Sequence, residues 1–434
     1  MFHIAERGST VRAEVVGGIT TFVAMAYIIV VNPAILAFAG IPQGPSTVAT
    51  ILTAVFGTLL MGLYANRPIA VAPYMGENAF IAFGLAAFGI AWQQRLGAVF
   101  VSGMIFLVIT LLGVRTWLAK SISPSMKHSF AAGIGLFLTF IGLFEAGIVK
   151  SATAVPVQIG DVRSTQVLLA VLGFVLIAAL MHRRVKGAIL IGIAVTALAG
   201  GLLGVGKAPK AIVAMPFTGE YDLSAIAFQL DLTSVLKLSF LPILLTLFLM
   251  SLLDTLGTLV GLGATAGMLD EKGEFPELEK PMAVDALTCM FAGVVGTSTS
   301  GAYIESSTGI REGARTGLAS VVTAALFALS LFFIPLFEPM QSLQYAYAPA
   351  LLLVGLLMFA SVAQIDFTDF TELVPAFATI VGMVFTFNIA NGLTAGLVLY
   401  PVMKVLAGRA REVRAGGWVL AALCAVYYVW GLPH

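Results

Sequence analysis

The sequence contains little charge and little cysteine. Of its 434 residues, 59% are hydrophobic and only 10% are charged, whereas a soluble domain has about 25% charged residues. This deficit excludes an ordinary soluble domain and indicates a membrane protein. The formal net charge of +1 offers no basic surface for nucleic acid. Cys289 and Cys424 both lie in apolar runs, so we expect neither a disulfide framework nor a zinc site.

Histidine is also scarce, which argues against an enzyme. His3, His128, His182 and His434 lie at the termini or at the ends of apolar runs. A serine–histidine hydrolase site at membrane depth is therefore not expected. The glycines of 261-GLGATAG-267 have the wrong spacing for a dinucleotide fingerprint, and we expect no cofactor.

Long apolar runs make up most of the chain. A membrane helix needs about 20 mostly apolar residues, and shorter runs are compatible with broken helices. The short run 417–431 has tryptophan and tyrosine near its ends, as expected of a helix lying on the membrane surface. The other runs predict fourteen spans, at residues 16–38, 47–65, 69–90, 96–113, 129–148, 166–182, 187–205, 237–263, 282–296, 298–311, 316–336, 347–364, 371–388 and 391–408.

The distribution of basic residues predicts the orientation. With a cytoplasmic N-terminus, about three quarters of the 23 basic residues fall on the cytoplasmic side, in agreement with the positive-inside rule. We therefore expect a multi-pass protein of the cell (inner or plasma) membrane with both termini in the cytoplasm.

A polar stretch divides the spans into two sets of seven. Residues 1–205 hold the first set, 206–236 form an external connection, 237–408 hold the second set, and 409–434 form a cytoplasmic tail. Because each set has an odd number of spans, the two sets enter the membrane from opposite sides. Such inverted repeats place a substrate site near the membrane midplane, between broken helices.

The third span of each set carries helix-breaking residues followed by an acid. In 68-PIAVAPYMGENAF-80, prolines and a glycine precede Glu77; in 296-GTSTSGAYIESSTG-309, glycines and hydroxyls precede Glu305. Proline and glycine disfavour a continuous helix. We predict two half-helices whose N-terminal ends meet near the membrane centre.

Three acids are predicted to lie at membrane depth: Glu77, Glu305 and Asp254. An ionised acid there costs about 2.5–3.5 kcal/mol, so it normally faces a cavity and serves transport. Asp254 shares a helical stripe with Ser251 and Thr258, which must face protein or water. Each of these acids either binds the substrate or coupling ion, or is a structural carboxylate that caps a broken helix. The structural alternative is strongest for Glu77.

Three further polar residues lie in or near the predicted spans. Asn78 either caps the predicted half-helix or binds the edge of a nucleobase with its donor and acceptor. Asp285, near Lys280, and Glu145, near the end of the fifth span, are expected to be charges at the membrane interface.

Four strings in this order resemble those of a known family: 15-VVGGITTFVAMAYIIVVNP-33, 72-APYMGENAF-80, 254-DTLGTLVG-261 and 303-YIESSTGI-310. They are similar to the nucleobase–cation symporters of the xanthine/uracil permease superfamily, in particular its adenine/guanine/hypoxanthine branch. The resemblance extends from about Glu14 to Arg409.

This resemblance implies an all-α membrane fold of two inverted seven-span repeats. Spans 1–4 and 8–11 would form a core domain, and spans 5–7 and 12–14 a gate domain through which a homodimer is expected. The third and tenth spans would each consist of a short strand followed by a helix. A purine base would bind between them, near the first and eighth spans.

The family's site residues can be carried over to matching positions. Asn78 matches an amide of the third span, Asp254 an acid of the eighth and Glu305 an acid of the tenth. Thr258 falls where the superfamily often has a second polar contact.

The sequence departs from the family pattern at three positions. Many purine permeases have an acid where this chain has Ser251 and a glycine where it has Tyr74, and some have an apolar residue in place of Glu77. Tyr74 would narrow the pocket or stack on the base, which leaves the preferred purine open.

The chemistry of a neutral purine fits these groups. Carboxylates accept its N–H bonds, Asn78 or a half-helix N–H donates to its acceptors, and Phe80 or Tyr27 offers a stacking surface. We expect proton symport, with Asp254 or Glu305 as the coupling acid and the other as the base-binding carboxylate. Sodium coupling, with Asp254 as a ligand, and an anion transporter or channel of the same fold are the alternatives.

Overall fold

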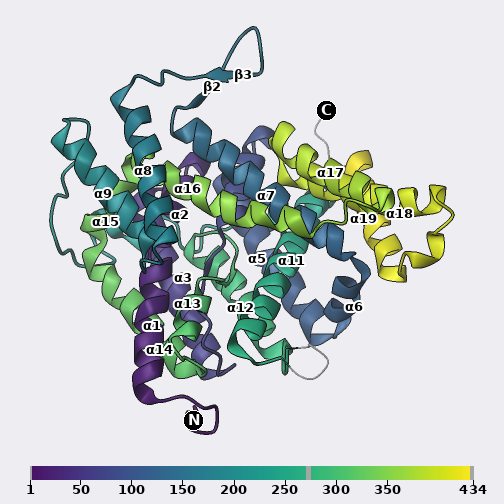
Figure 1. Cartoon of the computed structure of the whole chain (residues 1–434), viewed down its shortest axis with the longest axis horizontal. Helices are drawn as coiled ribbons and strands as arrows, with labels where there is room; N and C mark the ends of the chain where they lie inside the picture. Colours follow the sequence, from purple (N-terminus) through teal and green to yellow (C-terminus); the bar gives the residue numbers. More distant parts are fainter. Residues whose placement is uncertain (1, 270–274, 431–434) are drawn as a thin grey trace.

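The computed structural model describes residues 2–269 and 275–430 and consists mainly of helices, as Figure 1 shows. The predicted all-α membrane class is confirmed. In the described part of the chain, nine helical segments are long and apolar enough to cross a membrane. They are Val11–Ala39 (α1 Val11–Met25 and α2 Ile28–Leu36), α3 Gln43–Leu63, α5 Trp92–Leu111, α7 Pro124–Glu145, α8 Thr165–His182, α11 Leu241–Ala266, Gly317–Ser342 (α14 Gly317–Ser330 and α15 Ile334–Ser342), Gln344–Gln364 (beginning with α16 Gln344–Phe359) and α18 Ile389–Leu406.

Shorter helices occupy the remaining predicted spans. They are α9 Ala188–Leu202, α12 Glu279–Val295, α17 Phe370–Phe385 and the two interrupted segments described below. The helix α19 Ala415–Trp430 covers the run expected to lie on the membrane surface. Helices thus fall at each predicted position, while the count of fourteen spans stays a prediction.

The third and tenth predicted spans are each interrupted by a short strand, which confirms that prediction. The strands β1 Val71–Pro73 and β4 Ser300–Ala302 pair in antiparallel fashion, with Val71 opposite Ala302. Short helices follow them: α4 Met75–Ala79, continued by a π-helix over Phe80–Gly84, and α13 Ser306–Arg311. Because the strands run in opposite directions, α4 and α13 begin at opposite ends of the strand pair.

The helices pack in two groups, and the strand pair lies in the first group, against α3 and α12. In one group, α3 and α1 pack against α14, α1 against α13, and α5 against α12. In the other, α7 packs against α16 and α17, α17 against α18, and α8 against α9 and α16. The helices α7 and α16 pack so closely that a Cβ added at Gly355 would lie 2.5 Å from the backbone oxygen of Gly135. Small residues commonly allow such helix contacts in membranes.

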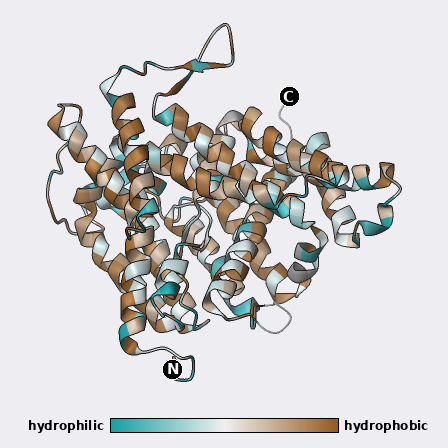
Figure 2. Cartoon of the chain, viewed as in Figure 1, coloured by the Kyte–Doolittle hydropathy of each residue, from teal (hydrophilic) through white to brown (hydrophobic). Residues whose placement is uncertain are grey.

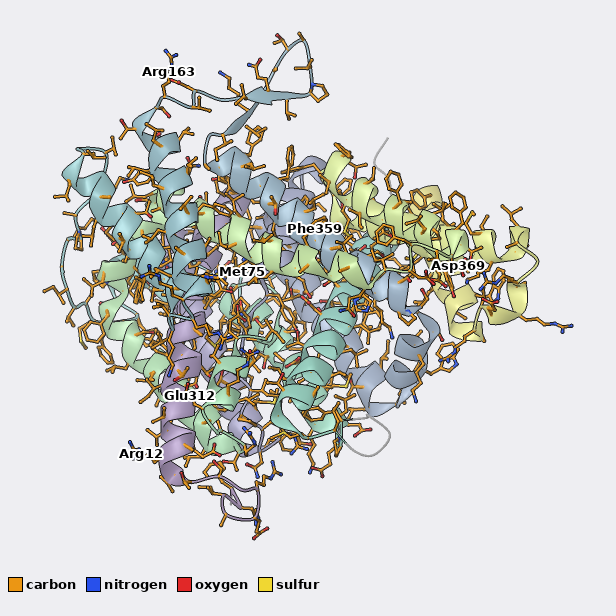
Figure 3. The ribbon with its side chains drawn as sticks, viewed as in Figure 1. Arg12, Met75, Arg163, Glu312, Phe359 and Asp369 are labelled. Carbon is orange, nitrogen blue, oxygen red and sulfur yellow. The ribbon has the colours of Figure 1, made fainter. Side chains whose placement is uncertain are left out.

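Polar residues concentrate in loops and at helix ends, whereas the helices are predominantly hydrophobic (Figure 2). In Figure 3, Met75 at the start of α4 lies near the middle of the molecule, and Arg12 and Arg163 lie at opposite edges. The short helix α4 therefore begins between these two edges, where a midplane site is expected.

The connection at 206–236 folds onto the helices and does not extend away from them. The backbone amides of Ala214, Phe228 and Asp231 donate to the carbonyls of Phe332, Val294 and Gln93 at 3.0, 2.8 and 3.0 Å. A hairpin of β2 Val149–Ser151 and β3 Val157–Ile159 projects beyond the helices at the top of Figure 1. That hairpin and the helices α6 Val114–Ser121 and α10 Leu232–Val235 were not predicted.

Glu14 shows how this fold accommodates a buried acid. Its fully buried carboxylate accepts backbone N–H bonds from Arg315 at 2.8 Å and Thr316 at 3.1 Å, and a longer one from Ala319. These amides lie at the N-terminal end of α14, where unpaired N–H groups and the helix dipole favour a negative charge. Glu14 therefore fixes α1 to α14.

Candidate functional site

Glu305 is positioned by the break between α1 and α2. It directly precedes α13 and is half-buried. The hydroxyl of Tyr27, in the two-residue break, donates a hydrogen bond of 2.6 Å to Oε1 of Glu305. The break therefore places a phenol donor on the predicted acid, a role that the sequence interpretation did not assign to Tyr27.

Asp254 lies in α11 and faces a small cavity that is open on one side. The carboxylate is half-buried and close enough to Glu305 and Glu77 for electrostatic interaction with both. The structure thus brings the three predicted acids together. The cavity is lined by Lys127, Phe130, Ala131, Ile134, Met250, Leu253, Asp254 and Leu393.

Glu77 points across to α11 and does not cap its own short helix. Its Oε2 accepts a 2.9 Å hydrogen bond from the Ser251 hydroxyl, three residues before Asp254. The carboxylate is fully buried, and its Oε1 has no hydrogen-bond partner in the described part of the chain. The Thr299 hydroxyl lies beside this carboxylate but outside hydrogen-bonding geometry.

Asn78 belongs to a buried amide network beside the acids. Its Nδ2 donates to Oδ1 of Asn32 in α2 at 2.9 Å. Asn32 in turn donates to the hydroxyls of Thr50 and Thr297, at 2.8 and 2.9 Å. Asn32 was missed as a site residue, although an amide within the apolar string 15–33 was a signal for it. The Oδ1 of Asn78 has no partner among the described residues.

The candidate aromatics differ in their surroundings. Tyr74 shares a 2.8 Å hydrogen bond with the Thr255 hydroxyl, and its ring lies against Gly301, where an added Cβ would clash with it. Phe80 is fully buried, with its ring against Gly84. Neither is among the residues lining the cavity at Asp254. Phe130, which does line it, was not predicted.

Thr258, the fourth residue after Asp254, is half-buried on α11. It continues the polar stripe of that helix, as its spacing predicts. It does not line the cavity at Asp254, so its predicted contact with substrate stays a prediction.

The expectation for Asp285 was wrong. Its side chain is fully buried, and Oδ2 accepts a 3.2 Å hydrogen bond from the backbone amide of Ala302 in β4. The nearby Lys280 suggested an interface position, but α12 packs against β4 and brings Asp285 under the strand. Glu145 accepts hydrogen bonds from Gln344 at 2.8 Å and Tyr347 at 3.0 Å, joining the end of α7 to α16.

The comparisons with known proteins define the class. The fold resembles the transmembrane domain of a cyanobacterium bicarbonate transporter, BicA, with a TM-score of 0.65 and 16% identity over 89% of this chain and 97% of that one. At this identity the likeness shows the fold alone. Many membrane transporters place their substrate sites at broken helices of this kind.

The chain belongs to the xanthine/uracil permeases, described as "Permease family", whose profile matches residues 12–394. It is 41% identical to the adenine permease AdeP of Escherichia coli over 95% of this chain and 91% of that protein. It is 38% identical to the guanine/hypoxanthine permease PbuG of Bacillus subtilis over 99% of this chain and 98% of that protein. The resemblance inferred from the four sequence strings is confirmed.

Proposed function

We propose that this protein imports purine nucleobases by proton symport with alternating access. The observation that supports the proposal is that Asp254 lines a cavity between α7 and α11, within electrostatic range of Glu305, the residue that directly precedes α13 of the broken tenth span. The relatives' names, an adenine permease and a guanine/hypoxanthine permease, support a purine as the substrate.

The local chemistry fits a flat, uncharged base. Asp254 and Glu305 offer acceptors for ring and exocyclic N–H groups, and backbone amides at the start of α4 offer donors. Phe130 and Ile134 supply apolar surface along the cavity, as small-molecule sites usually do. Asn78 donates one N–H to Asn32 at 2.9 Å and the other to the Met75 sulfur at 4.0 Å. Its unpartnered Oδ1 is available to accept a ligand N–H.

Proton coupling follows from the charges. Two carboxylates within electrostatic range disfavour simultaneous ionisation at low dielectric. A neutral base brings no charge to balance them, so protonation of one acid makes joint movement of base and proton favourable. Asp254 or Glu305 carries this role in the proposal.

Alternating access requires two bodies that move against each other. We assign the helices of spans 1–4 and 8–11 to a core and those of spans 5–7 and 12–14 to a gate. Their packing in two groups supports this division. The cavity lies between them, because Phe130 belongs to α7 and Asp254 to α11. Lys127 at its rim lies in the first turn of α7, on the predicted cytoplasmic side. The expected homodimer through the gate stays a prediction.

The test is uptake of labelled adenine, guanine and hypoxanthine into proteoliposomes under an imposed pH gradient. The wild type should accumulate at least one of these bases, and Glu305→Gln should not. The control is Glu220→Gln, because Glu220 is an exposed carboxylate on the external connection. Undiminished gradient-driven uptake by Glu305→Gln would reject the proposal.

The fold of a bicarbonate transporter makes anion transport the second candidate. Half-helix N-termini can attract an anion, but Asp254, Glu305 and Glu77 would repel it. Flux of labelled bicarbonate or sulfate without purine flux would favour this candidate. Sodium coupling is tested by repeating purine uptake with sodium removed.

A further inference from the structure

Glu77 differs from Glu14, the other fully buried glutamate among the described residues, in how its charge is compensated. Glu14 accepts three backbone N–H bonds at a helix end, which satisfy its buried carboxylate oxygens. Glu77 accepts one hydroxyl hydrogen bond, from Ser251, and its second oxygen has no partner in the described structure. A fully buried carboxylate with an unpaired oxygen is costly unless it is neutral or gains a partner.

The surroundings of Glu77 hold acids and hydroxyls. The charged groups facing it are Asp254 on α11 and Asp285 on α12, both acids, and Tyr74 precedes it on its own segment. No basic side chain of the described residues is paired with Glu77, and no group of three metal-ligating side chains is found among those residues. The negative surroundings favour a proton on this carboxyl.

The two neighbouring hydroxyls suit a group that changes its protonation state. Ser251 donates to Oε2, and Thr299, whose hydroxyl is also unpaired and fully buried, lies beside the carboxyl. A hydroxyl can donate to a carboxylate and accept from a carboxylic acid. Both forms of Glu77 can therefore be satisfied by rotation of hydroxyls, without movement of the backbone.

We propose that Glu77 is a second proton-carrying site, placed behind Asp254. This rests on the proposed function. Asp254 faces the open cavity and exchanges protons with water, whereas Glu77 is fully buried on the far side of Ser251. A proton that leaves water binds the Glu77 carboxylate through the polar stripe of α11, and it returns by the same route when the site empties.

The first experiment measures proton linkage of base binding in nanodiscs between pH 5.5 and 8.5. Each linked proton changes the affinity about tenfold per pH unit. Glu77→Gln, which is isosteric and permanently neutral, should bind base with one linked proton fewer than the wild type. The matched control, Glu145→Gln, removes a hydrogen-bonded carboxylate on the gate helices and should keep the wild-type number. An unchanged number in Glu77→Gln overturns the inference.

The second experiment detects the proton without any substrate. The infrared difference spectrum between acid and alkaline pH should contain a protonated-carboxyl band that is missing in Glu77→Gln. In Ser251→Ala the band should persist with a shifted frequency, which provides a test should Glu77→Gln fail to fold. A spectrum in which neither substitution alters such a band overturns the inference. Sodium-dependent binding that Glu77→Gln abolishes would also overturn it. A wild type that shows the band but binds no purine contradicts only the proposed function.

Discussion

Tyr27 donates a 2.6 Å hydrogen bond to Glu305 across 278 residues of sequence. The contact joins the break between α1 and α2 to the start of α13. It links the first predicted span to the interrupted tenth span, which carries Glu305 of the proposed site.

Removing this bond should weaken base binding. A hydrogen bond to a charged group contributes about 1.5–3 kcal/mol, so Tyr27→Phe should lower purine affinity by roughly tenfold or more. The loss arises because Glu305 is no longer held toward α11. Equilibrium binding to purified protein measures it, with Tyr64→Phe as the control because Tyr64 is 57% exposed. Wild-type affinity in Tyr27→Phe would show that the bond plays no part in the site.

Glu14 should matter for stability and little for substrate choice. Glu14→Ala leaves the backbone amides at the start of α14 without their acceptor, which should cost about 2–3 kcal/mol. The thermal midpoint of unfolding in detergent should fall, while the ranking of purine affinities should not change. Glu6→Ala is the comparison, because that side chain is 76% exposed. Equal midpoints for the two variants would contradict the structural role.

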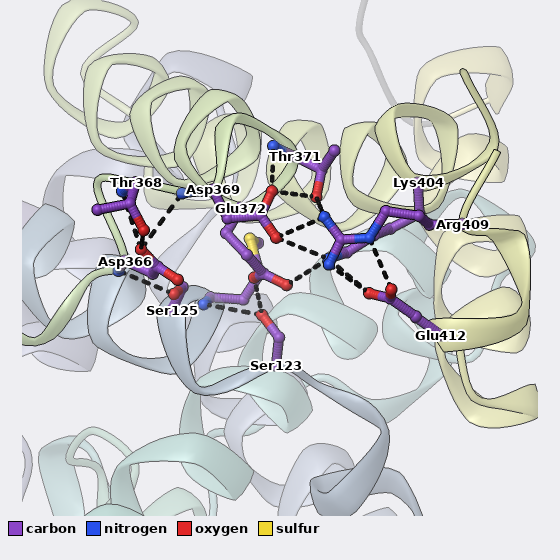
Figure 4. A network of polar contacts seen from close by, with 11 residues as sticks. Ser123, Ser125, Asp366, Thr368, Asp369, Thr371, Glu372, Lys404, Arg409 and Glu412 are labelled. Carbon is purple, nitrogen blue, oxygen red and sulfur yellow. Dashed lines mark hydrogen bonds and ion pairs between the residues drawn. The ribbon is translucent and has the colours of Figure 1, made fainter. Parts of the chain in front are cut away.

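An ion cluster ties the ends of α7, α17 and α18 together (Figure 4). The ammonium of Lys404 is 2% exposed and lies 2.9 Å from Glu372, 3.1 Å from Glu412 and 3.4 Å from Asp369. Glu372 also accepts a 2.6 Å hydrogen bond from Ser123. Lys404→Met should destabilise the protein by about 3 kcal/mol, because the mostly buried Glu372 loses its counter-charge. A thermal midpoint equal to that of exposed Lys150→Met would contradict this.

The same cluster predicts sensitivity to acid. The Thr371 hydroxyl, with Arg409, holds the pKa of Asp369 well below its usual range, and hydrogen bonds from Arg409 and Lys404 lower the pKa of Glu412. A lowered folded-state pKa gives stability that is present above the unfolded pKa of about 4 and lost as the pH falls below it. The thermal midpoint should therefore fall below about pH 4, and less steeply in Lys404→Met. Parallel pH profiles would argue against this linkage.

An ion pair outside this cluster joins the two proposed domains. Lys186, between α8 and α9, lies 2.9 Å from Glu312, which follows α13. An exposed pair contributes about 0.2–1 kcal/mol, so Glu312→Lys should shift the balance between access states by up to about fivefold. Labelling of a cysteine introduced at Lys127, on the cavity rim, measures that balance. The double charge reversal Lys186→Glu with Glu312→Lys should restore the balance. Failure to do so would show that this ion pair does not stabilise one access state.

Composition and breaker residues were enough to predict the helical membrane class and the interruptions at β1 and β4. Those signals are local: apolar length, proline and glycine. The position of Asp285 depends on packing of α12 against β4, which no local pattern encodes. The partners of Asn78 and Glu77 were missed for the same reason, because Asn32 and Ser251 are 46 and 174 residues away. Ser251 and Glu77, both departures from the family pattern, form one hydrogen-bonded pair.

Equilibrium binding of labelled adenine, guanine and hypoxanthine to the wild type and to Asp254→Asn tests the central claim most directly. We predict saturable binding of at least one base by the wild type, displaced by unlabelled purine and not by bicarbonate. Asp254→Asn should weaken it by about 2–4 kcal/mol, a factor of roughly 30 or more, because a ligand N–H loses its carboxylate acceptor. Equal affinity in Asp254→Asn, or no purine binding by the wild type, would contradict the account.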